Sequence, residues 1–295
     1  MASTIGWELY RSFLGVMREG SLSGAARAAG ITQPTVGRHV AALEKALGLP
    51  LFIRSPTGLA PTEAAQSLRG HVETMESTAA ALERTAASQG DGVRGVVRVS
   101  ASEVVCVEVL PQIVSGLRER HPALAIELVA SNRLQDLLRR EADIAVRMTR
   151  PRQELLVARR IGNVEVGLHA HRRYLAAHGT PRQAAELARH SLIGFDQETA
   201  FVRGAMKAVP GLRRDSFSMR TDSDLTQLAL IRAGAGIGFC QVALARRGND
   251  LVRVLPRQFT LALDTWVTMH EDLRHSPRCR VTFDALVEGM QRHIA

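Results

Sequence analysis

The sequence is poor in aromatic residues, in cysteine and in long apolar runs. Aromatic residues make up 4% of its 295 positions, and its three cysteines, Cys106, Cys240 and Cys279, lie far apart. Distant cysteines in odd number exclude a disulfide scaffold and a zinc ribbon, and they are typical of a reducing cytoplasm. No stretch approaches the roughly 18 apolar residues of a transmembrane helix, and no basic, apolar leader opens the chain. The sequence therefore predicts a globular cytoplasmic protein without a membrane partner.

Lysine is nearly absent, although the chain is basic. The formal net charge is +9, and only Lys45 and Lys207 among the 38 basic residues are lysine. Such a charge permits nucleic-acid binding without proving it. Residues 1–90 hold eight basic and seven acidic residues, whereas the remainder holds 30 and 22. A DNA-binding site in the N-terminal part must therefore depend on a few placed arginines rather than on bulk charge.

Helical and strand-like patterns divide the chain into segments. We expect short helices over 1–61, one long helix over 62–87, a flexible hinge over 88–92 and a separate domain over 93–295. In that last domain strand-like and helix-like runs alternate, which predicts an α/β fold with a largely parallel sheet and two lobes. Lobe I is expected to comprise about 93–163 and 268–295, and lobe II about 164–267. One helix is expected over 104–120 and another over 134–141.

The first 61 residues carry the pattern of a helix-turn-helix. A short alanine-rich helix over 24–29 ends at Gly30, and a second helix begins with Thr32 as its N-cap and Pro34 in its first turn. That second helix buries one apolar face, and small or polar residues occupy the other. Such a helix fits the DNA major groove, which is about 12 Å wide. A plain three-helix bundle is the alternative interpretation.

Several of these polar residues suit contacts with DNA. Gln33 could reach an adenine edge, the Thr35 methyl group a thymine, and Arg38 a guanine edge or a phosphate. Residues 51–62 resemble a β-hairpin, in which Arg54 could lie along a phosphate or in the minor groove. The predicted DNA-binding residues are Thr32, Gln33, Pro34, Thr35, Arg38, His39 and Arg54.

The long helix carries a narrow apolar seam. Its apolar residues recur at alternating spacings of three and four, which is the pattern of a coiled coil. They are Ala65, Leu68, Val72, Met75, Ala79, Leu82 and Ala86. We therefore expect this helix to dimerise the protein, and packing onto the C-terminal domain is the alternative.

The same N-terminal residues closely resemble those of LysR-type transcriptional regulators. The resemblance covers about 60 residues without gaps and rests on Glu19-Gly20-Ser21-Leu22-Ser23, Ala25-Ala26, Thr32-Gln33-Pro34-Thr35-Val36-Gly37-Arg38, Leu43-Glu44, Leu47-Gly48, Leu51-Phe52-x-Arg54 and Leu59-x-x-Thr62-Glu63-Ala64. It implies a winged helix-turn-helix, a dimerising linker helix and an effector-binding domain of the periplasmic-binding-protein type. One departure is Gly37, where the family usually has serine, and a helical glycine costs roughly 0.5–1 kcal/mol.

Ligands of α/β sheets bind beyond the carboxyl ends of strands, near helix N-termini. Backbone N–H groups after one such strand could hold a carboxylate, and the resemblance implies a usual ligand contact there. Arg147 could form a bidentate pair with the same group. The predicted effector-binding residues are Ser102, Glu103, Val104, Arg147, Met148, Phe195, Asp196, Thr221, Asp222 and Ser223. The alternatives are that both serines only cap helices and that Arg147 pairs with a structural acid, while the acidic residues would suit a ligand that also carries an amine.

Motifs for catalysis and for cofactors are missing. The run at 234–238 is not a dinucleotide fingerprint, because it leads from helix into strand, and we assign it to backbone geometry. His169 and His171 share one strand face without a third metal ligand. We therefore expect no cofactor, no metal and no enzymatic activity. Cys106 and Cys240 lie in apolar segments typical of buried, inert thiols.

Together these observations predict a DNA-binding transcriptional regulator whose DNA binding responds to a small molecule in the cleft between the lobes. Its expected partners are a double-stranded operator, a carboxylate or amino-acid-like effector and a second copy of itself, as a dimer or tetramer. RNA polymerase is a further candidate partner. Two alternatives stay open, namely a cytoplasmic solute-binding module with an N-terminal dimerisation domain and a thiol-based redox-sensing regulator.

Overall fold

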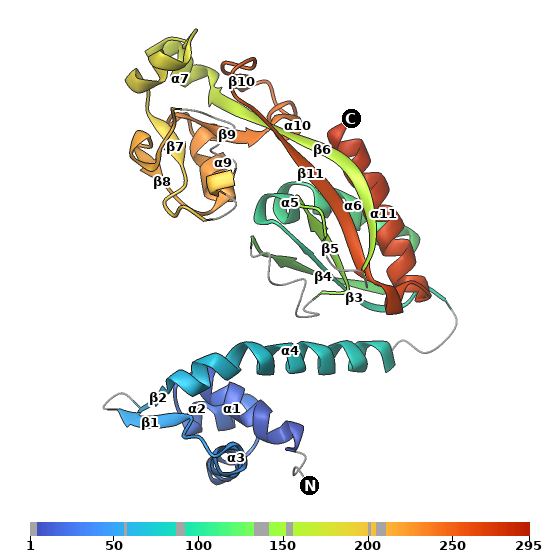
Figure 1. Cartoon of the computed structure of the whole chain (residues 1–295). Coiled ribbons are helices and arrows are strands. Elements are labelled where there is room, and N and C mark those ends of the chain that lie inside the picture. The colour runs from blue at the N-terminus through green and yellow to red at the C-terminus, as the bar shows by residue number, and fades with distance from the viewer. Residues whose placement is uncertain are drawn as a thin grey trace. The chain divides into compact units, whose positions relative to one another are not determined.

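The computed structural model describes residues 5–55, 58–86, 92–132, 142–151, 156–199, 202–204 and 211–295. These residues form two compact units, one before the linker and one after it (Figure 1). None of the helices in the described part of the chain is long and apolar enough to cross a membrane.

The first unit contains three short helices, a hairpin and a long helix. They are α1 (Trp7–Glu19), α2 (Leu22–Ala29), α3 (Gln33–Leu47), β1 (Phe52–Ser55), β2 (Gly58–Pro61) and α4 (Glu63–Ala86). The short helix α2 begins two residues earlier than predicted, because Ser21 accepts the Gly24 N–H at 3.1 Å and so caps it. Gly30 ends α2 with a φ of 67°, a left-handed conformation that favours glycine.

The core of this unit also buries the first half of α4. Phe13 and Leu14 of α1 pack with Leu43 of α3 and with Ala65 and Val72 of α4. The expected seam of α4 therefore has two different halves. Its first half is used inside the same chain, whereas Met75 and Leu82 in the second half are 41% and 68% exposed.

The second unit is built on one mixed sheet. Its strands are β3 (Gly95–Ala101), β4 (Leu124–Ala130), β5 (Ile144–Arg147), β6 (Leu156–His171), β7 (Leu192–Gly194), β8 (Met219–Arg220), β9 (Ile237–Gln241), β10 (Leu251–Arg253) and β11 (Thr260–His270). Their order is β4-β3-β5-β11-β6-β9-β7-β8, and β10 pairs with β6.

The prediction of a largely parallel sheet is wrong for the centre of this sheet. The outer strands β3, β4 and β5 are parallel, and so are β7, β8 and β9. Between these sets, β6 and β11 run antiparallel to each other and to their neighbours. Strand β6 has 16 residues and starts at Leu156 rather than at Val164, and it pairs with β11 over 156–167 and with β9 over 166–170.

Helices pack on the sheet, and one of the expected helices is interrupted just before a proline. They are α5 (Glu103–Glu108), α6 (Leu110–Arg120), α7 (Arg172–His178), α9 (Asp224–Arg232), α10 (Val242–Ala245) and α11 (Pro277–Ile294). The single helix expected over 104–120 is wrong, because the chain breaks at Val109. Pro111 lacks the N–H that would continue the helix and clashes with the preceding turn. The helix expected over 134–141 lies outside the described residues.

A shared core joins the two strand sets. Val97 and Val99 of β3 belong to the same buried cluster as Leu286 of α11, Ile193 of β7 and Ile231 of α9. Helices α6 and α11 lie beside each other along β6 and β11 (Figure 1). The strand ends that carry the predicted effector residues are thus anchored in one continuous core.

Candidate functional site

Helix α3 presents a polar face and buries an apolar one. Gln33, Pro34 and Arg38 are exposed, whereas Val36 and Val40 are buried against α1 and α2. This alternation follows from the helical period, since residues three and four apart share a face. The exposed face has the residue types that donate and accept hydrogen bonds at base edges.

The Thr32 hydroxyl does not cap α3, contrary to our expectation. Thr32 stands at the N-cap position, but its Oγ1 shares a hydrogen bond of 2.8 Å with Thr35 Oγ1. Thr35 Oγ1 also accepts a long hydrogen bond of 3.4 Å from Arg38. The two threonines and Arg38 therefore form one polar group on the first turns of α3.

The two other predicted DNA contacts are placed differently. His39 Nδ1 shares a hydrogen bond of 2.7 Å with the hydroxyl of Ser12, which is buried in α1. The imidazole thus joins α3 to α1. Arg54 lies on β1 opposite Leu59 of β2, and its side chain lies outside the described part of the structure.

Gly37 faces the neighbouring helix without being crowded. A Cβ at this position would lie 3.7 Å from Leu22 Cδ1, an ordinary van der Waals distance. Its backbone is helical rather than left-handed. The fold therefore does not require glycine here.

In the second unit, residues far apart in sequence meet where α5 and α9 begin. The Ser223 hydroxyl donates to Glu103 Oε2 at 2.8 Å and accepts the Thr226 N–H at 3.3 Å. The Glu103 N–H donates to Asn132 Oδ1 at 3.1 Å, and Asn132 Nδ2 donates to Asp224 Oδ1 at 3.3 Å. The structure thus brings Glu103 and Ser223 together.

Asn132 and Asp224 belong to this junction but were missed by the sequence analysis. Asp224 follows Ser223 at the start of α9, so its position next to a predicted site residue was a usable signal. Asn132 lies just after β4, and only the pairing of β4 with β3 places it beside Glu103. Without knowledge of that pairing its role is invisible.

The junction places two carboxyl groups close together. Burial, the largest cause, raises the pKa of Asp224; hydrogen bonding with Asn132 opposes this, while the charge of Glu103 raises the pKa further. Next to Glu103, the Ser102 hydroxyl is buried and has no hydrogen-bond partner among the described residues. Ser102 is the N-cap residue of α5, but its side chain makes no cap hydrogen bond. The interpretation of Ser102 as a capping side chain is therefore wrong, whereas Ser223 does cap α9.

Arg147 is held inside the fold. Its side chain is 6% exposed, and it donates to Ser100 Oγ at 2.7 Å and to the Val146 carbonyl at 3.0 Å. Its neighbour Met148 packs against the core. Ser100 of β3 is a further residue that the sequence analysis missed, because only the β3–β5 pairing shows it.

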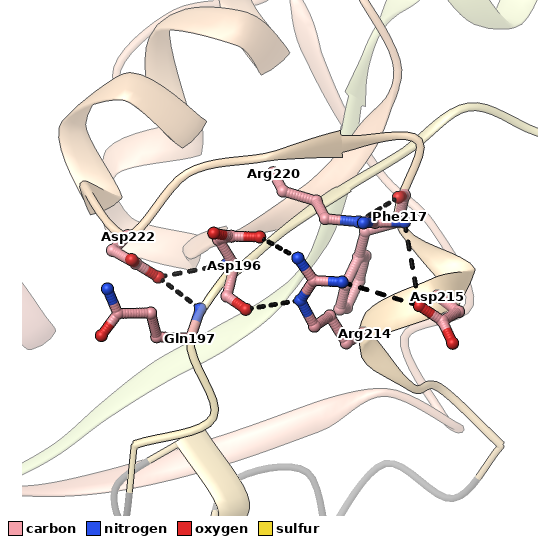
Figure 2. A network of polar contacts seen from close by, with 7 residues as sticks. All are labelled: Asp196, Gln197, Arg214, Asp215, Phe217, Arg220 and Asp222. Carbon is pink, nitrogen blue, oxygen red and sulfur yellow. Dashed lines mark hydrogen bonds and ion pairs between the residues drawn. The ribbon is translucent and has the colours of Figure 1, made fainter.

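Figure 2 shows how the acids that follow β7 and β8 are satisfied. Asp222 Oδ1 accepts the backbone N–H groups of Asp196 at 3.1 Å and Gln197 at 2.8 Å. The Asp196 carboxylate pairs with Arg214, whose Nε also donates to the Asp196 carbonyl at 2.7 Å. Both acids thus have partners within the same strand ends.

The pairing of β7 with β8 also explains the positions of Phe195 and Thr221. Phe195 is partly buried, and the Thr221 N–H donates to the Gly194 carbonyl at 2.9 Å. Because β7 and β8 are parallel neighbours, the segments after them emerge side by side. The structure therefore joins the segments 195–196 and 221–223, as their positions after strands suggest.

The thiols and the paired histidines have structural surroundings. All three cysteines are buried, and burial raises the pKa of Cys240 to about 12. His169 is buried with Nδ1 2.9 Å from the Gly167 carbonyl, whereas His171 Nδ1 accepts the Arg173 N–H. Within the described ranges, no three His, Cys, Asp or Glu side chains are grouped to hold a metal ion.

In the glycine run at 234–238, the backbone lies very close to the backbone at Ser191. A Cβ on Gly236 would lie 2.3 Å from the Ser191 carbonyl oxygen, so no other residue fits there without a shift of the backbone. The Ile237 N–H donates to that same carbonyl at 2.9 Å.

Comparison with known proteins agrees with both units. A family model described as "Bacterial regulatory helix-turn-helix protein, lysR family" matches residues 7–66, and one described as "LysR substrate binding domain" matches residues 90–291. The chain is 33% identical over 186 residues to the HTH-type transcriptional regulator CrgA of Neisseria meningitidis serogroup C, strain 8013. That match covers 63% of this chain and 62% of the relative, or about three fifths of its length.

Two solved structures share the fold. The structure of CrgA from Neisseria meningitidis has a TM-score of 0.59 at 26% identity, and the match covers 96% of this chain and 98% of that one. The structure of full-length CbnR complexed with its target DNA has a TM-score of 0.63 at 20% identity, with 98% and 99% covered. At that identity the second likeness shows the fold alone.

The architecture and these matches define the class of protein, a bacterial regulator with a helix-turn-helix domain and a substrate-binding domain. The chain belongs to the LysR family of transcriptional regulators. The resemblance carried by the N-terminal residues is thereby confirmed, and so is the predicted fold class.

Proposed function

We propose that this regulator binds a double-stranded operator through α3 and that a small molecule bound where α5 and α9 meet changes this binding. The observation that carries the proposal is the polar face of α3, on which Gln33 and Arg38 are exposed and Thr35 is half-buried, opposite the buried Val36 and Val40. The CbnR structure, which holds its target DNA, supports it by likeness of fold. Thr32, Pro34 and Arg54 complete the contact set, and His39 acts by holding α3 against α1.

For the effector we propose a metabolite that carries a carboxylate and an amine. Buried Arg147 and the unpartnered hydroxyl of Ser102 support the carboxylate, whereas the carboxyl groups of Glu103 and Asp224 support the amine. Val104, Met148, Phe195, Asp196, Thr221, Asp222 and Ser223 are the further proposed contacts. A ligand of this kind replaces the direct bond between Glu103 and Ser223, which links the two helix starts.

We further propose that the protein acts in the cytoplasm as a dimer or tetramer, without catalytic activity of its own and with RNA polymerase as a later partner. The curated relative is a transcriptional regulator rather than an enzyme. The exposed apolar residues Met75 and Leu82 support self-association. The buried thiols, with the pKa of Cys240 raised to about 12, speak against redox sensing.

Selection of a randomised duplex pool tests the DNA proposal. We expect enrichment of a dyad by the wild-type chain and a loss of about five- to 150-fold in affinity for Arg38→Ala, because a base contact by arginine contributes about 1–3 kcal/mol. Arg11→Ala is the matched control, since it removes the same charge from an exposed position on α1. Equal enrichment by both variants, with and without metabolite extract, would contradict the role of α3.

A further inference from the structure

A hollow lies away from the junction of α5 and α9 and shares no residue with it. It has a volume of about 540 Å³ and is lined by residues around the break between α5 and α6, by α10 and by α11. Val109, Ile113 and Ala243 form its apolar part. Gly289 brings α11 directly onto Ile113, because a Cβ there would lie 2.4 Å from Ile113 Cδ1.

The rim of this hollow is cationic. Its polar lining consists of Gln112, Arg247, Arg292 and His293, and it contains no carboxylate. The side chain of Arg292 is exposed and makes no hydrogen bond or ion pair with any other residue that the structure describes. Glu288, one helical turn before it, does not pair with it in the described structure. A guanidinium group at the mouth of a hollow is therefore without a counter-charge.

The second arginine is held in place by its neighbours. Arg247 donates to the Glu108 carbonyl through Nη1, and its Nη2 lies 3.3 Å from His293 Nδ1. His293 Nε2 lies 2.9 Å from Gln241 Oε1. Burial, the largest cause, and the charge of Arg247 both lower the pKa of His293. Because the Arg247 guanidinium can only donate, Nδ1 accepts from it, and Nε2–H donates to Gln241 Oε1.

The carboxylate of Glu108, next to Val109 in the chain, offsets these charges only in part. The Arg232 guanidinium donates two hydrogen bonds, of 2.6 and 2.9 Å, to the Glu108 carboxylate, and this contact lowers the pKa of Glu108. The charge of Arg247 also lowers the pKa of Glu108, so this one carboxylate faces both Arg232 and Arg247. Arg247 and Arg292 give the hollow a net positive character beside an apolar floor.

We propose that this hollow is a second ligand site, which binds a small carboxylate with an apolar, ring-sized body. Arginine presents a planar fork that matches a carboxylate in two places. Ligand sites in proteins typically have volumes of about 300–1,000 Å³, are mostly apolar and carry a few polar groups that orient the ligand. The apolar body lies on Val109, Ile113 and Ala243, and the carboxylate lies between Arg247 and Arg292. The site shares no residue with the proposed effector site.

Fluorine NMR on the full chain tests this site with 4-fluorophenylacetate as the probe. We expect saturable binding and a loss of about tenfold in affinity for Arg292→Gln, since a hydrogen bond to a charged group is typically of that size. Arg280→Gln is the matched control, because Arg280 is an exposed arginine on the same helix and away from the hollow. The uncharged analogue 4-fluorophenylacetamide should bind at least about tenfold more weakly than the acid.

A second variant tests the location independently of charge. Gln112 is exposed at the rim, so Gln112→Trp fills the mouth without disturbing a buried residue, and it should weaken the probe by about tenfold or more. Absence of saturable binding up to about 10 mM would overturn the proposal. So would binding that is equally strong in Arg292→Gln and Arg280→Gln, because the probe would then occupy another site, including the effector site.

Discussion

Two residues of α3, Gly37 and His39, differ in how strongly the fold constrains their side chains. Gly37 departs from the serine that its family usually has, yet its surroundings leave room for a Cβ. His39 has the opposite character, because its imidazole is bonded to buried Ser12. The same short helix therefore contains one position that the fold leaves open and one that it uses for support.

We expect Gly37→Ala to raise the free energy of unfolding by about 0.5–1 kcal/mol, because alanine loses less backbone entropy than glycine in a helix. Urea denaturation of the two proteins measures the difference. Gly48→Ala is the control, since Gly48 has a φ of 69° and alanine is strained in that left-handed conformation. The opposite order, with the Gly48 variant more stable, would show that helix propensity does not govern these sites.

In the second unit, side-chain contacts join α5 and α9 at both of their ends. Glu103 at the start of α5 accepts from Ser223 at the start of α9, and Glu108 at the end of α5 pairs with Arg232 at the end of α9. Since α5 has only six residues, it has little stability as an isolated helix. Its position depends on these contacts and on the buried residues between them, so the proposed effector, by breaking the contact at one end, would allow the helix to shift.

The Glu108–Arg232 pair gives this element a pH dependence. The pKa of Glu108 is lowered, chiefly by its hydrogen bond with Arg232, so the pair stabilises the fold above the usual glutamate pKa and loses this effect as the pH falls. We expect Arg232→Gln to lower stability at pH 7 by up to about 1 kcal/mol, as for other partly exposed ion pairs. The deficit should shrink as the pH falls below about 4.3, because the unfolded chain takes up a proton at this glutamate before the folded chain does.

Thermal unfolding between pH 3.5 and 7.5 measures this deficit. Arg246→Gln provides the matched control, because Arg246 is exposed and has no ion pair in the described structure. A deficit for Arg232→Gln that is independent of pH would indicate lost packing of the arginine stem rather than loss of the pair.

At the scale of the whole molecule, the two halves of α4 differ in their surroundings. Its first apolar residues complete the core of the first unit, and its later ones are exposed in the single chain. Arg18 and Glu76 bind in two places, at 3.0 and 2.6 Å, and so fix α1 on α4 close to the exposed half. Assembly through that half would therefore set the spacing of two α3 helices.

We expect Leu82→Glu to convert the assembled protein into smaller species, because it places a charge where an apolar seam would be buried. Sedimentation velocity at micromolar concentration measures the change in mass. Gln66→Glu serves as the control, since it adds the same charge at an exposed position in the first half of α4. An unchanged mass for Leu82→Glu would rule out assembly through this half of the helix.

Local patterns predicted much of the fold correctly. The helices and hairpin of the first unit, strand β4 and helix α11 follow from periodicity, caps and turn residues, which depend only on neighbours in sequence. The break at Val109 had a local signal in Pro111 that the helical period concealed. The antiparallel centre of the sheet had no local signal, because strand direction depends on pairing between β6 and β11, about 100 residues apart.

By itself, the sequence determined the class of this protein, since helix-turn-helix spacing, capping residues and the seam of α4 are encoded within a few turns of chain. Tertiary structure alone decided which of the predicted effector residues meet, and it placed Asn132 and Ser100 beside them through strand pairing. It also decided that the first half of the α4 seam is buried within the same chain. Tertiary structure likewise placed two arginines at the hollow between α6, α10 and α11. Contacts between distant segments depend on the free energy of the packed core, which no short stretch of sequence contains.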